Sequence, residues 1–381
     1  MKVKAAVLRE FNKPLSIEIL ELAPPGPGEI LVKYVNTGWC NSDLHFMSGA
    51  SGPIPLPMVL GHETAGVVEA LGSGVTEFQK GDHVIAPWMA YCGRCPECVT
   101  GRTNVCRTSL GSMLNGTLPK GGIRLTDSGG NPVRIEIFVG GFSTHQVIDA
   151  QAAVKIPKEL PLEQACFLGC AVPSGWGAVT NKANVKPGES VAVFGVGGVG
   201  LNAIRAAAMR QANPIIAVDI EGHNEAKALE FGATHFIDSS KEDPIVSIQL
   251  LTGGAKQSDG TVLGGGCNVV IEAIGDAGAY EQAFWAMGIS GRLISVGLVP
   301  VDQIVRIPMA FLSLQDKSII GSLYGSINTH LDIPRYAELA LKGQLKVDKL
   351  ITKHFKLEEI NDVAEAMKRR EIQGRWVCDL D

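Results

Sequence analysis

The sequence predicts an α/β protein in which a small β-rich body is joined to a doubly wound parallel sheet. Short strands between Gly- and Pro-rich turns fill residues 1–90, and strand, glycine turn and helix alternate from Glu189 onward. Mixed elements return after about residue 325. We therefore expect one domain made of residues 1–171 and 325–381, and a second domain made of residues 172–324.

The β-rich body is predicted from short apolar and β-branched runs. The turn sequences APPGPGE, SGPIPLP and QKGD separate these runs. The expected strands are Lys4–Leu8, Ile30–Asn36, Ala65–Leu71 and Asp82–Pro87. Residues 107–142, which are rich in Gly, Ser and Thr around TDSGGNP, are expected to form an open loop.

Continuous apolar runs, typical of strands buried on both faces, mark the second domain. VAVF (191–194) and IIAVD (215–219) are two such runs, and the helices LNAIRAAAMRQA and NEAKALEFG follow them. NVVIEAIG, GRLISVGL and KSIIGSLYG predict three further strands, while residues 252–266 are expected to be a surface loop. The last elements are an amphipathic helix that presents Leu357, Ile360, Val363, Ala364 and Met367, and a strand over residues 374–380.

Charge and composition exclude several classes of partner. The 381 residues carry a net charge of −5, with 45% hydrophobic and 19% charged residues, so nucleic acid and anionic membranes are poor candidates. No apolar run approaches the roughly 18 residues that a membrane helix needs. The N-terminal MKVKAAVLREF alternates like a strand and lacks a signal peptide's apolar core. We expect a cytoplasmic, reducing location, which favours metal ligation over disulfides.

Four of the nine cysteines lie within fifteen positions, in the sequence CGRCPECVTGRTNVC. Cys92, Cys95, Cys98 and Cys106 are separated by two, two and seven residues, a spacing that allows four thiolates to enclose one tetrahedral Zn²⁺. A bacterial iron–sulfur run would space its last cysteine by three residues and follow it with proline. Two disulfides and unrelated free thiols remain alternatives, and a structural zinc is favoured.

A dinucleotide-binding turn is predicted where Gly195, Gly197 and Gly200 form G-x-G-x-x-G between a buried strand and a helix. Such a turn lets a pyrophosphate approach the helix N-terminus, where free N–H groups favour negative charge. Asp219 lies nineteen residues beyond Gly200, at the end of the next strand, and is expected to bind an adenosine ribose. Its carboxylate would repel a 2′-phosphate, so NAD is favoured over NADP.

A second metal site is suggested by Cys40, His62 and Cys170, because two thiolates and one imidazole leave a fourth zinc position open. The three residues are far apart in sequence, so spacing alone does not connect them. Cys166 and Cys267 lie in apolar runs and are interpreted as buried core.

The chain resembles the zinc-dependent alcohol dehydrogenases of the medium-chain dehydrogenase/reductase superfamily over essentially its whole length. Besides the cysteine quartet, the motifs are GWCNSDLH (38–45), GHETAGVVEALGSGV (61–75), GDHV (81–84), LGCAVPSGWGA (168–178), GVGGVG with Asp219, and LEFGATHFID (229–238). The resemblance implies a GroES-like catalytic domain with a structural zinc lobe near residues 90–108, and a Rossmann domain that binds NAD(H). It also implies two zinc ions per chain, one catalytic and one structural.

The resemblance assigns roles to single residues. Cys40, His62 and Cys170 match the catalytic zinc ligands; Glu63 matches a carboxylate behind the zinc, and Asp43 the acid that orients the histidine ligand. Ser42 and His45 match a relay that takes the alcohol proton, through a cofactor ribose hydroxyl, to solvent. A zinc-bound alkoxide would then pass hydride to nicotinamide. The cofactor-binding positions are Gly195, Gly197, Gly198, Val199, Gly200, Asp219, Ser174 and Arg375, with Arg375 expected near the pyrophosphate.

The implied substrate pocket contains Trp88, Val296, Leu298 and Leu323 with part of the 107–142 loop. A flat, bulky Trp88 favours medium-chain, aromatic or allylic primary alcohols over ethanol. The long loop matches dimeric members of the family, so a homodimer is expected, with no nucleic-acid or membrane partner.

Three other functions are less favoured. The stretch 46–57 has no acid or base to hold a glutathione adduct, which disfavours a thiol-adduct formaldehyde dehydrogenase. Cys170 disfavours a polyol dehydrogenase, and a catalytically inactive relative would lack these ligands. The chain departs from the family at Asn41, where a basic residue often contacts the pyrophosphate, and we therefore predict weaker NAD(H) binding and faster release.

Overall fold

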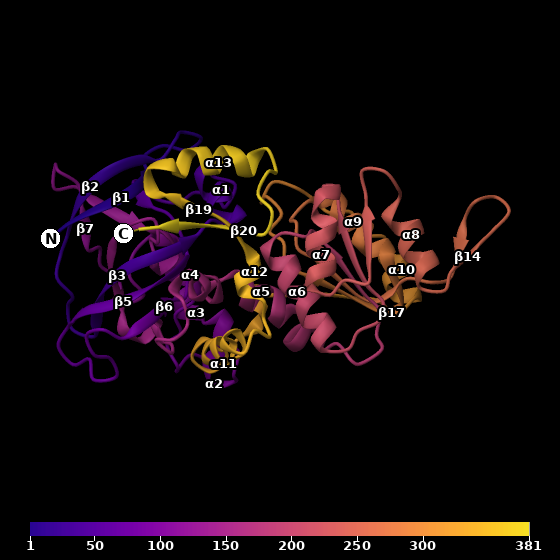
Figure 1. The fold of residues 1–381 in the computed structure, drawn as a ribbon, viewed down its shortest axis with the longest axis horizontal. Coiled ribbons are helices and arrows are strands. Elements are labelled where there is room, and N and C mark those ends of the chain that lie inside the picture. Colours follow the sequence, from indigo (N-terminus) through magenta and orange to yellow (C-terminus); the bar gives the residue numbers. More distant parts are fainter. Residues whose placement is uncertain (381) are drawn as a thin grey trace. The chain divides into compact units, whose positions relative to one another are not determined.

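The computed structural model describes residues 1–380, which divide into two compact units (Figure 1). The first unit contains residues 1–171 and the chain from Ile327 onward, and the second contains Val172–Ser326. No helix among the described residues is long and apolar enough to cross a membrane.

The first unit is built mainly from short strands. Its strands are β1 (Lys2–Leu8), β2 (Ser16–Leu22), β3 (Glu29–Gly38), β4 (Met58–Val59), β5 (Glu63–Leu71), β6 (His83–Ala86), β7 (Leu125–Thr126), β8 (Pro132–Ile135), β9 (His145–Asp149), β10 (Val154–Lys155), β19 (Ile351–Lys356) and β20 (Arg375–Asp379). Its helices are α1 (Asn41–Ser48), α2 (Pro96–Val99), α3 (Arg107–Ser112), α4 (Leu162–Ala165), α11 (Thr329–Leu341), α12 (Val347–Leu350) and α13 (Ile360–Lys368).

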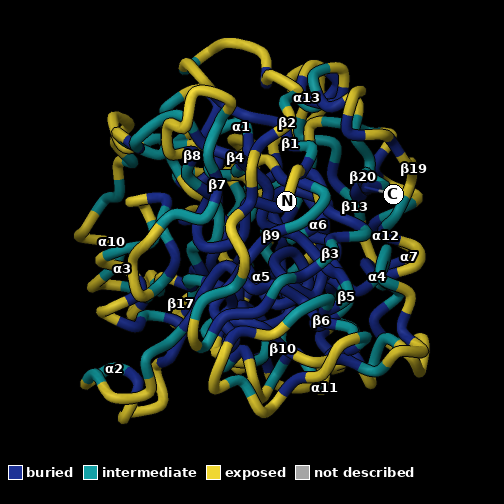
Figure 2. Tube along the Cα trace, turned by 90° about the vertical axis from the view of Figure 1, so that its left-hand side faces the viewer, coloured by how far each residue is buried: buried dark blue, intermediate teal, exposed yellow. Residues whose placement is uncertain are grey.

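Two sheets form the body of this unit. Strands β1-β2-β7-β8-β4 close into a barrel whose core includes Val3, Leu20, Leu125 and Val133. A seven-stranded sheet has the order β10-β6-β5-β3-β20-β19, and β9 also pairs with β3. Most residues of β3, β5 and β9 are buried, and Figure 2 shows these strands largely in dark blue and teal.

Residues 107–142 do not form the open loop that the sequence suggested. They contain α3, β7 and β8, and the last two strands complete the barrel. Leu125, Val133 and Ile135 point into the barrel core, and TDSGGNP is the turn between them. The sequence did not predict these strands, because strands of two and four residues are too short to show a clear alternation of apolar and polar residues.

The second unit contains the predicted doubly wound sheet. Its six strands are parallel in the order β13-β12-β11-β16-β17-β18, so the strand order reverses between β11 and β16. The strands are β11 (Val191–Phe194), β12 (Ile215–Asp219), β13 (His235–Asp238), β16 (Cys267–Glu272), β17 (Met287–Ser295) and β18 (Ser318–Gly321). The helices are α5 (Ala171–Gly177), α6 (Gly198–Met209), α7 (Glu225–Phe231), α8 (Pro244–Leu251), α9 (Ala277–Ala286) and α10 (Met309–Leu314).

The expected surface loop at residues 252–266 is a small hairpin. Strands β14 (Ala255–Lys256) and β15 (Val262–Leu263) pair with each other and project from the second unit (Figure 1). The pairing is local and solvent-exposed, so the hairpin adds nothing to the core of this unit.

Candidate metal centres and nucleotide-binding turn

Strand pairing brings Cys40 and His62 together. In the β3–β5 ladder Gly38 lies opposite Glu63. Cys40, two residues after Gly38, and His62, directly before Glu63, therefore meet at the same end of the sheet. Cys40 is also the N-cap of α1. Cys170 follows the 3₁₀ turn Cys166–Gly169, which packs against β5 and adds the third side chain. Residues separated by 130 positions therefore meet in one place.

The three side chains form a buried group with a zinc-type donor set. The candidate ligand atoms of Cys40, His62 and Cys170 all lie within 4.8 Å of one another, and each residue is at most 8% exposed. The interaction with Cys170 lowers the pKa of the Cys40 thiol and raises that of Cys170, because the two sulfurs compete for one proton. Two thiols and an imidazole fit Zn²⁺ and leave one position for another ligand.

Two carboxylates face the Nδ1 atom of His62. Glu136 Oε1 is its hydrogen-bond partner at 2.9 Å, and Asp43 Oδ1 lies 3.3 Å away. Burial alone would lower the pKa of His62, but the charges of Glu136 and Asp43 outweigh it and raise this pKa well above its usual range. Since the carboxylates occupy Nδ1, the Nε2 atom remains as the metal-binding nitrogen.

Glu136 is the buried residue of this site that the sequence analysis missed. It lies in the 3₁₀ turn Glu136–Phe138, inside the stretch expected to be a loop, and is completely buried. No spacing rule connects it to His62, which is 74 positions away. The only signal was an acid within an apolar run, RIEIFVG, and that pattern is also typical of an ordinary strand.

Glu63 and Arg375 form a buried ion pair behind the three metal-ligand candidates. Arg375 Nε donates to Glu63 Oε2 at 3.3 Å, and its Nη2 lies 3.9 Å from Cys40 Sγ. Gly38 leaves room for this pair, since a Cβ there would come within 2.4 Å of Glu63 Oε2. Burial raises the pKa of Glu63 to about 7, although the charge of Arg375 opposes the shift. A guanidinium has five N–H donors, so the expected place of Arg375 near a pyrophosphate stays a prediction beside these contacts.

Ser42 and His45 lie on α1, directly after Cys40. Ser42 Oγ is 3.7 Å from Cys40 Sγ, which places a hydroxyl beside the candidate metal position. His45 Nε2 lies 3.3 Å from the amide nitrogen of the exposed Asn41. Burial lowers the pKa of His45 below its usual range, so the imidazole is neutral at neutral pH and can accept a proton.

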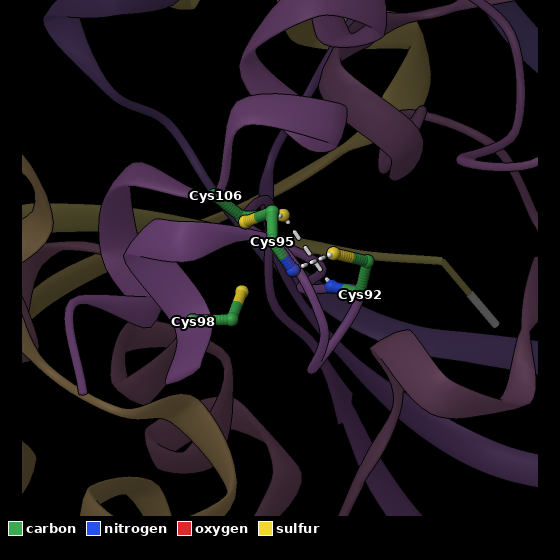
Figure 3. Close-up of side chains that lie close together, drawn as sticks. All are labelled: Cys92, Cys95, Cys98 and Cys106. Carbon is green, nitrogen blue, oxygen red and sulfur yellow. Dashed lines mark hydrogen bonds between the residues drawn. The ribbon is translucent and has the colours of Figure 1, made fainter. Parts of the chain in front are cut away.

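The cysteine quartet forms a second cluster with metal-site geometry. Figure 3 shows the four side chains converging, and all four sulfurs lie within 4.8 Å of one another. Cys95 Sγ and Cys106 Sγ are 3.8 Å apart. This matches the edge of about 3.8 Å expected for a tetrahedron with Zn–S bonds of about 2.3 Å. The quartet fills every position of such a tetrahedron, so a metal there could stabilise the local structure but could not bind substrate.

Backbone amides support the sulfurs of this cluster. The N–H groups of Cys92 and Cys95 approach Cys106 Sγ and Cys92 Sγ, each at 3.4 Å. The Arg94 backbone N–H and neighbouring donors lower the pKa of Cys92 to about 6, which favours the thiolate. The surrounding chain is largely exposed in Figure 2, where α2 lies at the edge of the first unit.

The glycine turn of the second unit lies at the place in the sheet where open α/β folds bind ligands. It follows β11 at the point where the strand order reverses, and α6 begins at Gly198. A Cβ on Gly200 would lie only 1.8 Å from the Gly195 carbonyl oxygen, so the close approach of turn and helix depends on glycine. The N–H groups of Val196 and Glu221 donate to the Asp219 carboxylate at 2.8 and 2.9 Å.

The remaining predicted positions are divided between the two units. Trp88 is 8% exposed and lies in the first unit, just after β6. Val296, Leu298 and Leu323 lie in the second unit, as does Ser174 on α5. Leu298 is 59% exposed. Their assignment to a substrate pocket and a cofactor site therefore stays a prediction.

Known proteins resemble this chain along its whole length. The family of alcohol dehydrogenase GroES-like domains matches residues 26–158, and the zinc-binding dehydrogenase family matches residues 198–342. An NDMA-dependent alcohol dehydrogenase from Amycolatopsis methanolica is 38% identical over 363 residues, which cover 95% of each chain.

Two solved structures cover all of this chain. An alcohol dehydrogenase zinc-binding domain protein from Burkholderia ambifaria has a TM-score of 0.91 with 34% identity, over 99% of that chain. A benzyl alcohol dehydrogenase from Acinetobacter calcoaceticus has a TM-score of 0.89 with 32% identity, over 100% of that chain. The predicted combination of a GroES-like domain and a Rossmann-type domain is thereby confirmed.

Proposed function

Because this chain belongs to the zinc-type alcohol dehydrogenases of the medium-chain dehydrogenase/reductase superfamily, we propose that it catalyses the reversible, NAD-dependent oxidation of alcohols to aldehydes or ketones. The observation that carries this proposal is the buried group Cys40, His62 and Cys170. A zinc ion held there would lower the pKa of a coordinated alcohol, and a bound nicotinamide would accept the hydride.

The side chains around this group have the properties that the reaction needs. Ser42 presents a hydroxyl to take the alcohol proton, and the neutral imidazole of His45 can pass a proton towards solvent. The Glu63–Arg375 pair places a buried carboxyl group and a buried guanidinium beside the ligands. All three ligands are buried, so charges at this group interact more strongly than they would in water. We propose a second, purely structural zinc at the cysteine quartet.

NAD is the proposed hydride acceptor. Asp219 ends β12 beside the glycine turn, and a carboxylate at this place favours a free ribose over a 2′-phosphate. A relative is named for its dependence on NDMA, so free NAD is not the sole acceptor to consider. A nucleotide that stays bound between turnovers would make an external acceptor such as NDMA necessary.

The proposed substrates are medium-chain, aromatic or allylic primary alcohols. The buried, flat Trp88 and the resemblance to a benzyl alcohol dehydrogenase support this class. We expect kcat/KM for benzyl alcohol, hexanol and geraniol to exceed that for ethanol by at least about tenfold, since each buried CH₂ contributes about 0.8 kcal/mol. A substrate panel measured with NAD, NADP and NDMA, with bound nucleotide quantified before turnover, tests the proposal.

The outcomes of this panel separate the parts of the proposal. If the protein turns over only with NDMA and is purified with bound nucleotide, free NAD is not the acceptor. The proposed alcohol oxidation would still hold. Ethanol performing as well as benzyl alcohol would contradict the substrate class. A zinc-loaded protein that oxidises no alcohol with any acceptor would contradict the function itself.

We expect Asn41→Arg to tighten NADH binding and slow its release. An arginine at the start of α1 would supply the charge-assisted bond that the neutral amide cannot make to a pyrophosphate. The expected decrease in the NADH dissociation constant is about tenfold, the lower end of what a charged hydrogen bond contributes. Stopped-flow fluorescence of NADH measures both quantities, and Asn41→Gln is the neutral control. An unchanged release rate in Asn41→Arg would refute the role of this position.

The lowered pKa of His45 predicts the acid limb of the pH profile. His45 can accept a proton only above its pKa, and burial places this pKa below the usual value near 6.5. As the pH falls through the lowered pKa, His45 becomes charged and kcat for alcohol oxidation should fall. His45→Gln should remove this limb, reduce kcat at neutral pH by at least about tenfold, and respond to added imidazole. A variant with an unchanged profile would show that protons leave by another route.

A homodimer is proposed on the basis of the second unit's open edge. Strand β18 ends the six-stranded sheet, and Ile319 on this strand is 42% exposed. Leu314, just before β18, is 81% exposed, and Val301 and Ile304 are exposed to a similar degree. An unpaired strand next to exposed apolar side chains favours pairing with a second copy. Sedimentation at equilibrium tests this by comparing the mass in solution with that of one chain.

A further inference from the structure

We propose that Glu136 is the main residue that positions the His62 imidazole for metal binding, while Asp43, which faces the same nitrogen from farther away, also holds the backbone of Cys40. This inference rests on the proposed function, because it requires a metal at Cys40, His62 and Cys170. It assigns a role to an acid that the sequence patterns did not single out and that the proposed reaction has not so far used.

The distances give the two carboxylates different main partners. Glu136 Oε1 is 2.9 Å from His62 Nδ1, and Glu136 Oε2 accepts the Gly61 N–H at 2.6 Å. Asp43 Oδ2 accepts the Cys40 N–H at 2.9 Å. Asp43 Oδ1 faces the same His62 Nδ1 at the longer distance of 3.3 Å. Nδ1 carries one hydrogen, and the shorter distance favours Glu136 as its main acceptor.

Both oxygens of Glu136 are thus committed to the segment that carries His62. One oxygen fixes the backbone just before the imidazole, and the other fixes the ring itself. With its proton held on Nδ1, the imidazole has a fixed orientation and its Nε2 lone pair is available to the metal. Asp43, in the first turn of α1, fixes the backbone of Cys40 by accepting its N–H.

The burial and backbone of Glu136 show that its position is costly. Its side chain is completely buried, and removing a carboxylate from water costs several kcal/mol unless strong partners replace the water. The next two residues, Ile137 and Phe138, have φ values of 33° and 71°. This left-handed region is unfavourable for a β-branched residue, and such strain is typically retained at functional sites. The chain therefore bends sharply at the place where Glu136 meets His62.

The test measures how firmly the metal is held, independently of turnover. Full-length wild type, Glu136→Gln, Glu136→Ala and Asp43→Asn are loaded with zinc, and a chelator removes the metal. Zinc at the cysteine quartet, a group that does not include Glu136, is the internal reference. Glu272→Gln, a change of a completely buried carboxylate in the second unit, is the matched control. The Co²⁺-substituted proteins supply the visible spectrum of the ligand set.

We expect the Glu136 variants to lose the metal at Cys40, His62 and Cys170 about 10- to 100-fold faster, in line with the loss of a carboxylate behind a histidine ligand. Their Co²⁺ spectrum should change, while the quartet zinc keeps its release rate. Glu136→Gln preserves shape and one acceptor oxygen, so it should fold even where Glu136→Ala does not. Glu272→Gln should leave both readouts as in wild type.

Three outcomes would overturn the inference. Wild-type release and an unchanged Co²⁺ spectrum in Glu136→Gln would show that Glu136 is only a buried acid. Faster metal release in Asp43→Asn combined with wild-type release in Glu136→Gln would give the positioning of His62 to Asp43. A wild-type protein that takes up no metal at Cys40, His62 and Cys170 would overturn the proposed function and this inference together.

Discussion

Cys98→Ser is expected to remove one zinc per chain and to unfold the lobe between Cys92 and Cys106. The lobe has almost no apolar core, since α2 is four residues long and Val99 is 69% exposed. Structural zinc supplies about 10–16 kcal/mol of apparent folding free energy in comparable small domains. Loss of one of four thiolates should therefore weaken zinc binding on the order of 10³-fold or more. Metal analysis gives the zinc content, and the melting temperature of the variant should fall.

Limited proteolysis shows whether the lobe itself unfolds in Cys98→Ser. Arg94 and Arg102 lie inside the lobe, so trypsin should cut there in Cys98→Ser and spare the wild type. Cys267→Ala is the control, because Cys267 is a buried thiol of the second unit outside both metal clusters. Activity should fall only as far as assembly is lost. A Cys98→Ser protein that is intact, stable and still holds two zinc ions would contradict the structural role of the quartet.

The sequence revealed those parts of the molecule whose chemistry is local. The quartet lies within fifteen positions, and the glycine turn lies between a strand and a helix that both follow from apolar patterns. Asp43 lies three residues after Cys40, so its approach to this ligand follows from one helical turn. In these cases chain connectivity fixes the distances before tertiary structure is known.

Other parts depend on contacts that the chain makes at long range. Cys40, His62 and Cys170 were connected by a resemblance and not by spacing, and the β3–β5 pairing is what brings the first two together. Glu136 was missed because neither a motif nor a regular period leads from it to His62. No motif indicated that Arg375 donates to Glu63, a residue 312 positions away. A side chain's partner, unlike its secondary structure, is decided by the folded chain.

Cys170→Ala is expected to abolish alcohol oxidation while the fold remains intact. Removing one of three ligands leaves a thiolate and an imidazole, which is too few for Zn²⁺ to hold an open catalytic position. The expected fall in kcat/KM is about 10³-fold or more, since the metal is proposed to ionise the substrate. Zinc content should drop from two to one per chain, and binding of NADH, measured by its fluorescence, should persist. The change thus separates the chemistry at Cys40 and His62 from the nucleotide site of the second unit.

The matched control lies one turn away. Cys166 is a completely buried thiol at the start of the 3₁₀ turn that ends just before Cys170. Its Sγ contacts the Glu163 carbonyl instead of the candidate ligands. Cys166→Ala removes the same atoms from nearly the same surroundings, so it reports the cost of a small cavity alone, about 1 kcal/mol of stability. It should keep both zinc ions and near wild-type activity. Equal activities of the two variants would mean that the Cys170 side chain only fills space in the core and that the reacting metal is held elsewhere.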